Sequence, residues 1–280
     1  MRADLSPRAR LAIYGLMCVL AIPFVFPTWW MVTSSFKPVQ EIFAFPPALL
    51  PRRLDLDAYT QVFALQPFAL QYWNSLYIAA VVTLGTMAVA SLAGYAFARI
   101  RFPGQNLVFM VVLLALLVPS EVTIVPLFRF FLGLGLVNTH WPLILVPILG
   151  APCVLATFIM RQFFITLPPE LEEAGRIDGL GRFGLFWRIA LPLARPALAS
   201  VAIFQFIWIW NDLLIALIFL GGDPDVAPLT VTIANLVNAT TGEGTQLLAA
   251  AAFVAMAVPM AIFFALQRHF VGGILAGAVK

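Results

Sequence analysis

The chain has 280 residues, of which 62% are hydrophobic and only 10% are charged, and its mean hydropathy is +0.98. Soluble domains carry roughly 25% charged residues, so this composition excludes an ordinary soluble protein and indicates an all-α polytopic membrane protein. The apolar runs reach about twenty residues, which favours transmembrane helices over the alternating strands of a barrel. The net charge of +3 comes without a basic cluster interleaved with aromatic residues, so we expect no nucleic-acid partner.

Cysteine and histidine give no sign of a metal or redox site. Cys18 and Cys153 both lie within apolar segments, where cysteine usually serves as a small buried hydrophobe. His140 and His269 are far apart in the chain and have no cysteine at ligand spacing. We therefore expect no metal site.

The first predicted span begins the chain after a short basic tail. An apolar run from Leu11 to about Thr33 follows this tail, and it is too long for the apolar region of a cleaved signal, which has about 7–15 residues. We expect a retained signal anchor. The predicted organisation is a cytoplasmic tail and first transmembrane helix at 1–33, a proline-rich external loop at 34–70, and a core of five further helices at 71–280.

Five further spans are predicted in that core. They lie at about 71–98, from 106 to about 131, at 141–160, at 196–220 and at 247–267. The third span is interrupted by Pro119, Ser120 and Glu121. An ionisable residue beside a proline either lines a cavity within the membrane or lies at the interface, because an unsatisfied charge in lipid is costly.

The distribution of lysine and arginine orients these six spans. With the N-terminus inside, the inner segments hold twelve of these residues and the outer segments hold four. Because positive charge is retained on the cytoplasmic side, both termini are predicted to be cytoplasmic. An odd number of spans would place the basic C-terminus outside, so six spans are favoured.

A polar segment at 168–196 is unusual in so apolar a chain. It carries four acids and four arginines, and the orientation above makes it cytoplasmic. Helical spacing groups its apolar residues on two faces, which are Leu171, Ala174 and Ile177, and then Phe183, Phe186 and Trp187. We expect two short amphipathic helices, hinged at Gly179 and Gly181, that offer a surface to a partner. The alternative is a charge run that only solvates a loop.

The chain shows no energy source of its own. Lys37 and Lys280 are its only lysines, and neither follows a glycine-rich loop, so a Walker A phosphate cradle is absent. No alternating relay of acids and histidines crosses the spans, which gives little support to a proton-driven carrier. A membrane-embedded enzyme is a further alternative, but no Ser/His/Asp, metal or paired-carboxylate arrangement supports it.

One motif in the polar segment resembles a known signature. Glu173-Ala174-Gly175, three residues, Gly179, nine residues, Ile189, one residue and Leu191-Pro192 resemble the EAA motif of binding-protein-dependent ABC importer permeases, E-A-A-x3-G-x9-I-x-L-P. Gly175 replaces the second alanine, which costs about 1 kcal/mol of helix propensity. Further segments are similar to the carbohydrate branch of this family, of maltose and α-glucoside type: Arg161-Gln-Phe-Phe, Ile177-Asp178-Gly179, Trp210-Asn211-Asp212 and the tail from Leu275 to Lys280.

The resemblance implies a type I ABC importer permease fold, in the prokaryotic cytoplasmic membrane, with a coupling loop at about 166–195. The residues it implies for ATPase coupling are Glu172, Glu173, Ala174, Gly175, Asp178, Gly179 and Leu180. It implies no enzymatic activity and no cofactor in this chain, with ATP and Mg²⁺ bound by two ATP-binding subunits or a homodimer of one. A second permease subunit, an extracytoplasmic solute-binding protein and membrane lipid are the other implied partners, and the C-terminal tail is expected to touch the ATPases.

A candidate substrate pathway is carried by the fifth span. Its residues are Trp208, Trp210, Asn211 and Asp212, with Glu121 from the third span. Aromatic rings can stack on the apolar faces of a sugar while the polar pair bonds its hydroxyls; the alternative is an interfacial aromatic belt beside a polar helix end. A phosphorylated cargo would favour Arg or Lys in the spans, which hold few, so a neutral sugar is expected over glycerol-3-phosphate, an amino acid or an anion.

Overall fold

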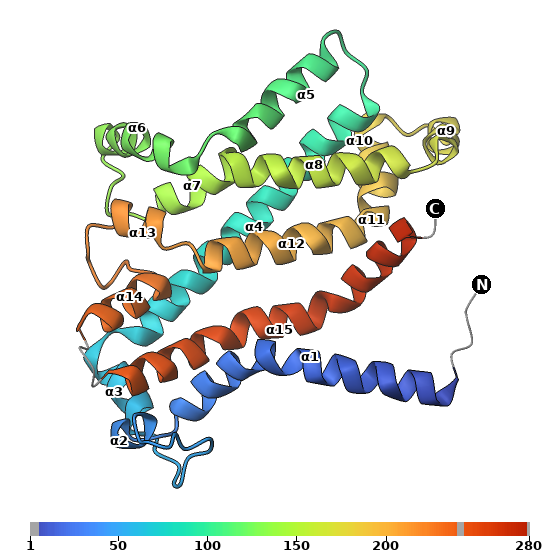
Figure 1. Cartoon of the computed structure of the whole chain (residues 1–280). Coiled ribbons are helices and arrows are strands. Elements are labelled where there is room, and N and C mark those ends of the chain that lie inside the picture. Colours follow the sequence, from blue (N-terminus) through green and yellow to red (C-terminus); the bar gives the residue numbers. More distant parts are fainter. Residues whose placement is uncertain (1–5, 240–243, 279–280) are drawn as a thin grey trace. The chain divides into compact units, whose positions relative to one another are not determined.

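The computed structural model describes residues 6–239 and 244–278, with side chains described for 6–237, 244–265 and 267. Within these ranges the regular elements are all helices (Figure 1), as the composition predicts. The chain divides into two compact units. Unit 1 comprises 1–66 and 233–256, and unit 2 comprises 67–232 and 257–280. Residues 233–256 thus group with the N-terminal segments.

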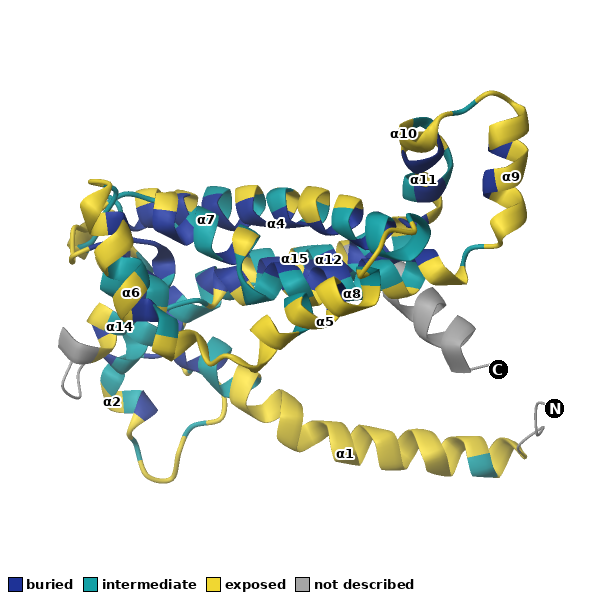
Figure 2. Ribbon diagram, turned by 90° about the horizontal axis from the view of Figure 1, so that it is seen from above, coloured by how far each residue is buried: buried dark blue, intermediate teal, exposed yellow. Residues whose placement is uncertain are grey.

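Among the described residues, four stretches of helix are long and apolar enough to cross a membrane. They are α1 (Pro7–Ser34), α4 (Phe68–Arg99), the α7–α8 run (Trp141–Leu149 and Ala151–Thr166) and the part of α15 (Thr245–Ala278) that reaches Ala265. These correspond to the predicted spans one, two, four and six. Figure 2 shows α1 exposed along almost its whole length, and such an apolar surface suits lipid. Two bent helix pairs bring the count to as many as six.

The third predicted span is broken. α5 (Gln105–Leu114) and the 3-10 turn η1 (Ala115–Leu117) meet α6 (Ser120–Gly133) at 95°. Pro119 lies at the break, and Val118 before it is extended, as a residue preceding proline tends to be. Glu121 is exposed in the first turn of α6 and lines neither of the two cavities described below.

The fifth predicted span, about 196–220, is wrong in extent. α12 (Arg195–Trp210) stops at Asn211, and α13 (Leu214–Phe219) is a separate helix. Asn211 is the C-cap of α12, and its Nδ2 donates to the Ile207 carbonyl at 2.7 Å in addition to the ordinary helical bond from its backbone N–H at 3.2 Å. The Asp212 carboxylate accepts the backbone N–H of Ile215 at 3.3 Å and so helps to start α13. An apolar count along the chain does not register such local capping bonds.

The remaining helices are short. They are α2 (Val39–Ile42), α3 (Asp57–Leu65), α9 (Pro169–Ile177), α10 (Arg182–Leu185), the π-helical η2 (Phe186–Ala190), α11 (Leu191–Leu193) and α14 (Leu229–Ala239). The 182–193 segment meets α12 at a bend of 74°.

Small residues hold the helices of unit 2 close together. α4 packs along α8 and α12 (Figure 1), and alanines fill much of their shared core, including Ala90, Ala156 and Ala197. In lipid there is little hydrophobic drive for helices to associate, so close backbone approach through small residues is the main source of packing energy. At Gly94 of α4 the contact involves the main chain of α8: a Cβ added there would lie 2.8 Å from the Met160 Cβ and 2.9 Å from the Arg161 backbone nitrogen.

Lys37 organises the segment that follows α1 in unit 1. Its side chain is buried, and its Nζ donates to the Ala48 carbonyl at 2.7 Å and lies 4.3 Å from the centre of the Trp30 ring. Burial lowers the pKa of Lys37, and the nearby Glu41 carboxylate partly opposes this shift. The ammonium group therefore ties the proline-rich segment back to the end of α1.

We expect Lys37→Met to loosen the segment at 38–55, because methionine keeps the apolar stem but loses the donor to Ala48. In detergent-solubilised protein, the rate of protease cleavage within this segment should rise several-fold. Arg53→Met, at an exposed position of the same segment, is the matched control and should leave the rate unchanged. Equal rates in both variants would show that Lys37 does not organise the segment.

Candidate coupling loop and translocation pathway

α9 begins where the sequence predicts the first amphipathic helix. Pro168 precedes it and Pro169 occupies its first turn, where a missing N–H costs nothing. Glu170 and Glu172 lie in the first turn and Arg176 in the last. This charge order complements the helix dipole and stabilises a helix that is only nine residues long.

Gly179 ends α9 in a Schellman motif. Its φ is +83°, the Leu180 N–H donates to the Gly175 carbonyl at 2.9 Å, and the Gly179 N–H donates to the Arg176 carbonyl at 3.0 Å. The left-handed backbone conformation at Gly179 therefore explains why a glycine stands at this predicted hinge. Gly181 differs, since it caps α10 with φ −70° and meets no steric need for glycine.

We expect Gly179→Ala to destabilise the turn after α9 by about 1–2 kcal/mol, because an L-residue is strained in the left-handed region. The matched control is Gly181→Ser in the same turn, where φ is −70° and serine is a favoured N-cap residue, so we expect no loss of stability. The apparent melting temperature of the purified protein measures both. If Gly181→Ser lowered it as much as Gly179→Ala, the strain argument would fail.

The inner face of α9 packs against the segment from α10 to η2. Gly175 is buried there, and an added Cβ would lie 2.6 Å from both Leu185 Cδ2 and Ile189 Cδ1. Figure 2 shows the buried residues of α9 on the side toward α10 and α11. The glycine in place of the second alanine of the motif therefore permits a contact closer than alanine would allow.

The outer face of α9 and its neighbours is apolar and exposed. Ile177 is 87% exposed, Phe183 70% and Trp187 59%, and the Phe183 and Trp187 rings stack within 5° of parallel. Phe186 is the exception to the predicted face, because it is buried against Tyr95 and Phe164. It opens the π-helical turn η2, where the α-helical spacing used for the prediction no longer holds.

The seven predicted coupling residues divide between the two faces. Glu173, Ala174, Asp178 and Gly179 are exposed, Leu180 is half-buried, and Glu172 and Gly175 are buried. Glu173 makes no hydrogen bond or ion pair within the described residues, so its carboxylate is available to a basic group on a partner. Glu172 instead forms ion pairs with arginines of the same chain.

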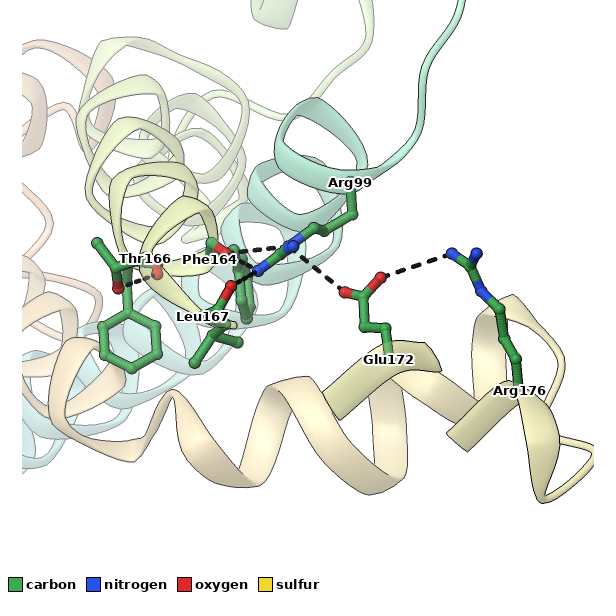
Figure 3. Close-up of polar contacts among 7 residues, drawn as sticks. Arg99, Phe164, Thr166, Leu167, Glu172 and Arg176 are labelled. Atoms are coloured by element: carbon green, nitrogen blue, oxygen red, sulfur yellow. Dashed lines mark hydrogen bonds and ion pairs between the residues drawn. The ribbon is translucent and has the colours of Figure 1, made fainter. Parts of the chain in front are cut away.

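Glu172 is held by two arginines (Figure 3). Its Oε1 lies 3.4 Å from Arg99 Nε, and its Oε2 lies 3.7 Å from Arg176 Nη2. Arg99, at the end of α4, also donates to the Phe164 carbonyl from Nε at 3.0 Å and from Nη2 at 2.7 Å, and to the Leu167 carbonyl. The Arg99 and Glu172 side chains are only 14% and 10% exposed, so removing one partner would cost roughly 3–5 kcal/mol. The sequence counts Arg99 only as a topological charge, and nothing in the spacing points to this role.

The predicted pathway residues are not all brought together. Trp208 is 60% exposed, whereas Trp210 is 6% exposed and packs on Phe206 and Tyr72. Asn211 and Asp212 spend part of their hydrogen-bonding capacity on capping α12 and α13. Asp212 lines a small cavity with Ser75 of α4 and Leu143 of α7.

Gln205 is a pathway candidate that the sequence reasoning missed. It is buried on α12 and lines a second cavity with Trp208 and with Leu155 and Ile159 of α8. Its Nε2 has no hydrogen-bond partner among the described residues. A lone amide within the apolar stretch at 196–210 was the available signal, because polar groups in such helices are costly.

The model of one protein family, described as the binding-protein-dependent transport system inner membrane component, matches residues 86–275 of this chain. The chain belongs to this family. It is a multi-pass permease of the inner membrane and not an enzyme, because ATP is hydrolysed by a separate subunit in such systems. The predicted resemblance to the binding-protein-dependent importer permeases is thereby confirmed.

Relatives and a solved structure agree with this assignment. The permease is 38% identical to the osmoprotective compounds uptake permease protein GgtD of Synechocystis sp., over 97% of this chain and 92% of that one. It is 39% identical to the alpha-glucoside transport system permease protein AglG of Rhizobium meliloti, over 83% of this chain but 62% of AglG. A crystal structure of a bacterial ABC transporter involved in the import of the acidic polysaccharide alginate shares the fold, with a TM-score of 0.78 at 19% identity, covering 95% of this chain and 99% of that chain.

Proposed function

We propose that the permease forms half of the translocation pathway of an ATP-driven sugar importer. It pairs with a second permease subunit, with two ATP-binding subunits that hold ATP and Mg²⁺, and with an external solute-binding protein. Membership of the family implies these types of partner in general. The observation that carries the coupling role is the exposed outer face of α9, where Glu173 lies unpaired within the described residues beside Ile177.

The exposed face suits a groove on an ATPase subunit. Ile177, Phe183 and Trp187 supply apolar area, and large aromatic residues dominate the energy of many interfaces. Glu173 adds a charge that fixes register with a basic group. Closure of the ATPase pair on ATP would then move the coupling loop and turn the pathway outward, and hydrolysis would return it. The predicted contact of the C-terminal tail, Leu275 to Lys280, lies outside the residues whose side chains are described.

A neutral sugar is the cargo that we propose. AglG is named for alpha-glucoside transport and GgtD for the uptake of osmoprotective compounds. Within unit 2, Arg99 and Arg161 are bound to carbonyls of neighbouring helices and are thus unavailable to an anion. An aromatic side chain, Trp208, beside the buried amide of Gln205 matches the apolar faces and hydroxyls of a sugar.

The test is reconstitution of the complex encoded by this gene and its neighbours. The ATP-binding subunit should co-purify with the permease, and proteoliposomes should take up labelled α-glucosides only with ATP and the binding protein present. Uptake of labelled glycerol-3-phosphate, an amino acid or an anion in place of the sugar would assign another cargo. Uptake that needs no ATPase subunit would overturn the proposed function itself.

A further inference from the structure

The joint between α8 and α9 is short and has no regular structure of its own. Leu167 and Pro168 are both extended, with φ/ψ of −67°/134° and −59°/131°. If the coupling helix α9 swung about these two residues, a push on α9 would be absorbed at the joint and would not reach the spans. Transmission therefore requires something that stiffens the joint.

Arg99, the last residue of α4, contacts both helices that meet at this joint. On one side it donates to the carbonyls of Phe164 and Leu167, at the end of α8, where orphan carbonyls and the helix dipole favour a cation. On the other side its Nε lies 3.4 Å from Glu172 in the first turn of α9. The single N–H of Arg99 Nε is donated to the Phe164 carbonyl, and Glu172 Oε1 accepts no hydrogen bond among the described residues, so charge attraction in a nearly buried ion pair makes the link to α9. Figure 3 shows Arg99 between the two helices.

Arg99 is itself firmly placed on α4. α4 and α8 are in close backbone contact at Gly94, and Arg161 of α8 donates back to the Phe97 carbonyl of α4 at 3.2 Å. Tyr95 packs edge-on against Phe164 in the same region. The ends of α4 and α8 thus form one packed body, to which Arg99 adds α9.

We propose that Arg99 is the positioning residue that makes α9 move as one body with the ends of α4 and α8, so that motion of the ATPase reaches the spans. The inference rests on the coupling role proposed above for α9. Glu172 is the carboxylate through which Arg99 holds α9. Arg176 contacts the same carboxylate, but from a side chain that is 63% exposed, so it contributes little to the link.

The first test compares transport with ATP use in the reconstituted complex. Arg99→Gln should still co-purify with the ATP-binding subunit, because the outer face of α9 is intact, while the number of sugars transported per ATP falls at least tenfold. Glu172→Gln removes the other partner of the Arg99–Glu172 ion pair by an isosteric change, and the same loss is expected. This variant replaces Arg99→Gln in the test if Arg99→Gln does not fold. Arg176→Gln, the matched control on the same carboxylate, should stay within twofold of the unaltered protein.

The second test measures the distance between α9 and the end of α4, and so reports whether the joint stays rigid. Spin labels at Glu170→Cys on α9 and Arg101→Cys beyond α4, with Cys18→Ser and Cys153→Ala, report the distance between the two segments with and without ATP. Both labelled positions are exposed. The distance should be narrow and unchanged by ATP with Arg99 present, and should broaden and shift with ATP in Arg99→Gln and Glu172→Gln.

Two results would overturn the inference. One is normal transport per ATP in both Arg99→Gln and Glu172→Gln. The other is an equal loss and an equal distance change in Arg176→Gln, which leaves the contact between Arg99 and Glu172 in place. The proposed function fails in a different way, by the absence of ATP-driven uptake in the unaltered complex, so the two failures are distinguishable.

Discussion

Glu173→Arg should lower ATP-driven uptake at least 100-fold while the permease still folds and inserts. The side chain is exposed, so reversing its charge disturbs nothing within the described residues. In the complex it would set an arginine against a basic group of the ATPase subunit, and like charges facing each other across an interface cost several kcal/mol. A loss of about 2.8 kcal/mol of docking energy corresponds to the 100-fold effect.

Two measurements check this prediction. Co-purification of the ATP-binding subunit should be lost together with uptake, while the size-exclusion profile of the permease is unchanged. Glu170→Arg is the matched control, with the same change of charge at an exposed residue of the same helix outside the motif, and its effect should be no more than about threefold. Full uptake with Glu173→Arg would refute the docking role proposed for this residue.

Replacing Gly94 should destabilise unit 2 by far more than replacing a glycine that has open space around it. A Cβ at this position would overlap Met160 Cβ at 2.8 Å and the Arg161 backbone nitrogen at 2.9 Å. The second of these is a main-chain atom, so the helices themselves must separate. Overpacking of this kind costs about 1–3 kcal/mol with alanine, and we expect more with leucine, which should prevent accumulation of folded protein.

The measurement is the apparent melting temperature of the detergent-solubilised protein, followed by size exclusion. Gly133→Ala, near the end of α6, is the control, because a Cβ there meets nothing within 4 Å. It should be neutral or stabilising by up to about 1 kcal/mol, the difference in helix propensity. A Gly94→Ala protein as stable as Gly133→Ala would refute the close contact of α4 and α8.

Composition and hydropathy predict the helical class and four of the six spans, because a run of apolar residues is the physical requirement for crossing lipid. The other two spans are broken for local reasons. Pro119 disrupts the third, and the capping bonds of Asn211 and Asp212 end the fifth near residue 210. A sliding apolar count averages over such single residues. The cytoplasmic location of the two termini rests on the charge distribution alone and remains a prediction.

For the coupling loop, spacing locates the motif but not the use of each residue. Two adjacent acids, Glu172 and Glu173, are alike in the sequence, yet one is buried against Arg99 and the other is exposed. The difference follows from a rotation of 100° per residue along a helix, and from which neighbour each face meets. Arg99 lies more than seventy residues before Glu172. No local pattern could pair them, because the contact depends on how α4 and α8 pack.

The π-helical turn at Phe186–Ala190 contains Trp187 of the exposed aromatic pair and leads into α11. Such a turn arises when an α-helix accommodates one extra residue, and each residue of an α-helix accounts for about 100° of rotation. Deleting one of the turn's residues that follow Trp187 would therefore restore regular α-helix and rotate Phe183 and Trp187 together by about 100° relative to α11. The direction in which the permease presents the proposed docking surface thus depends on one residue of length in this turn, independently of the composition of that surface.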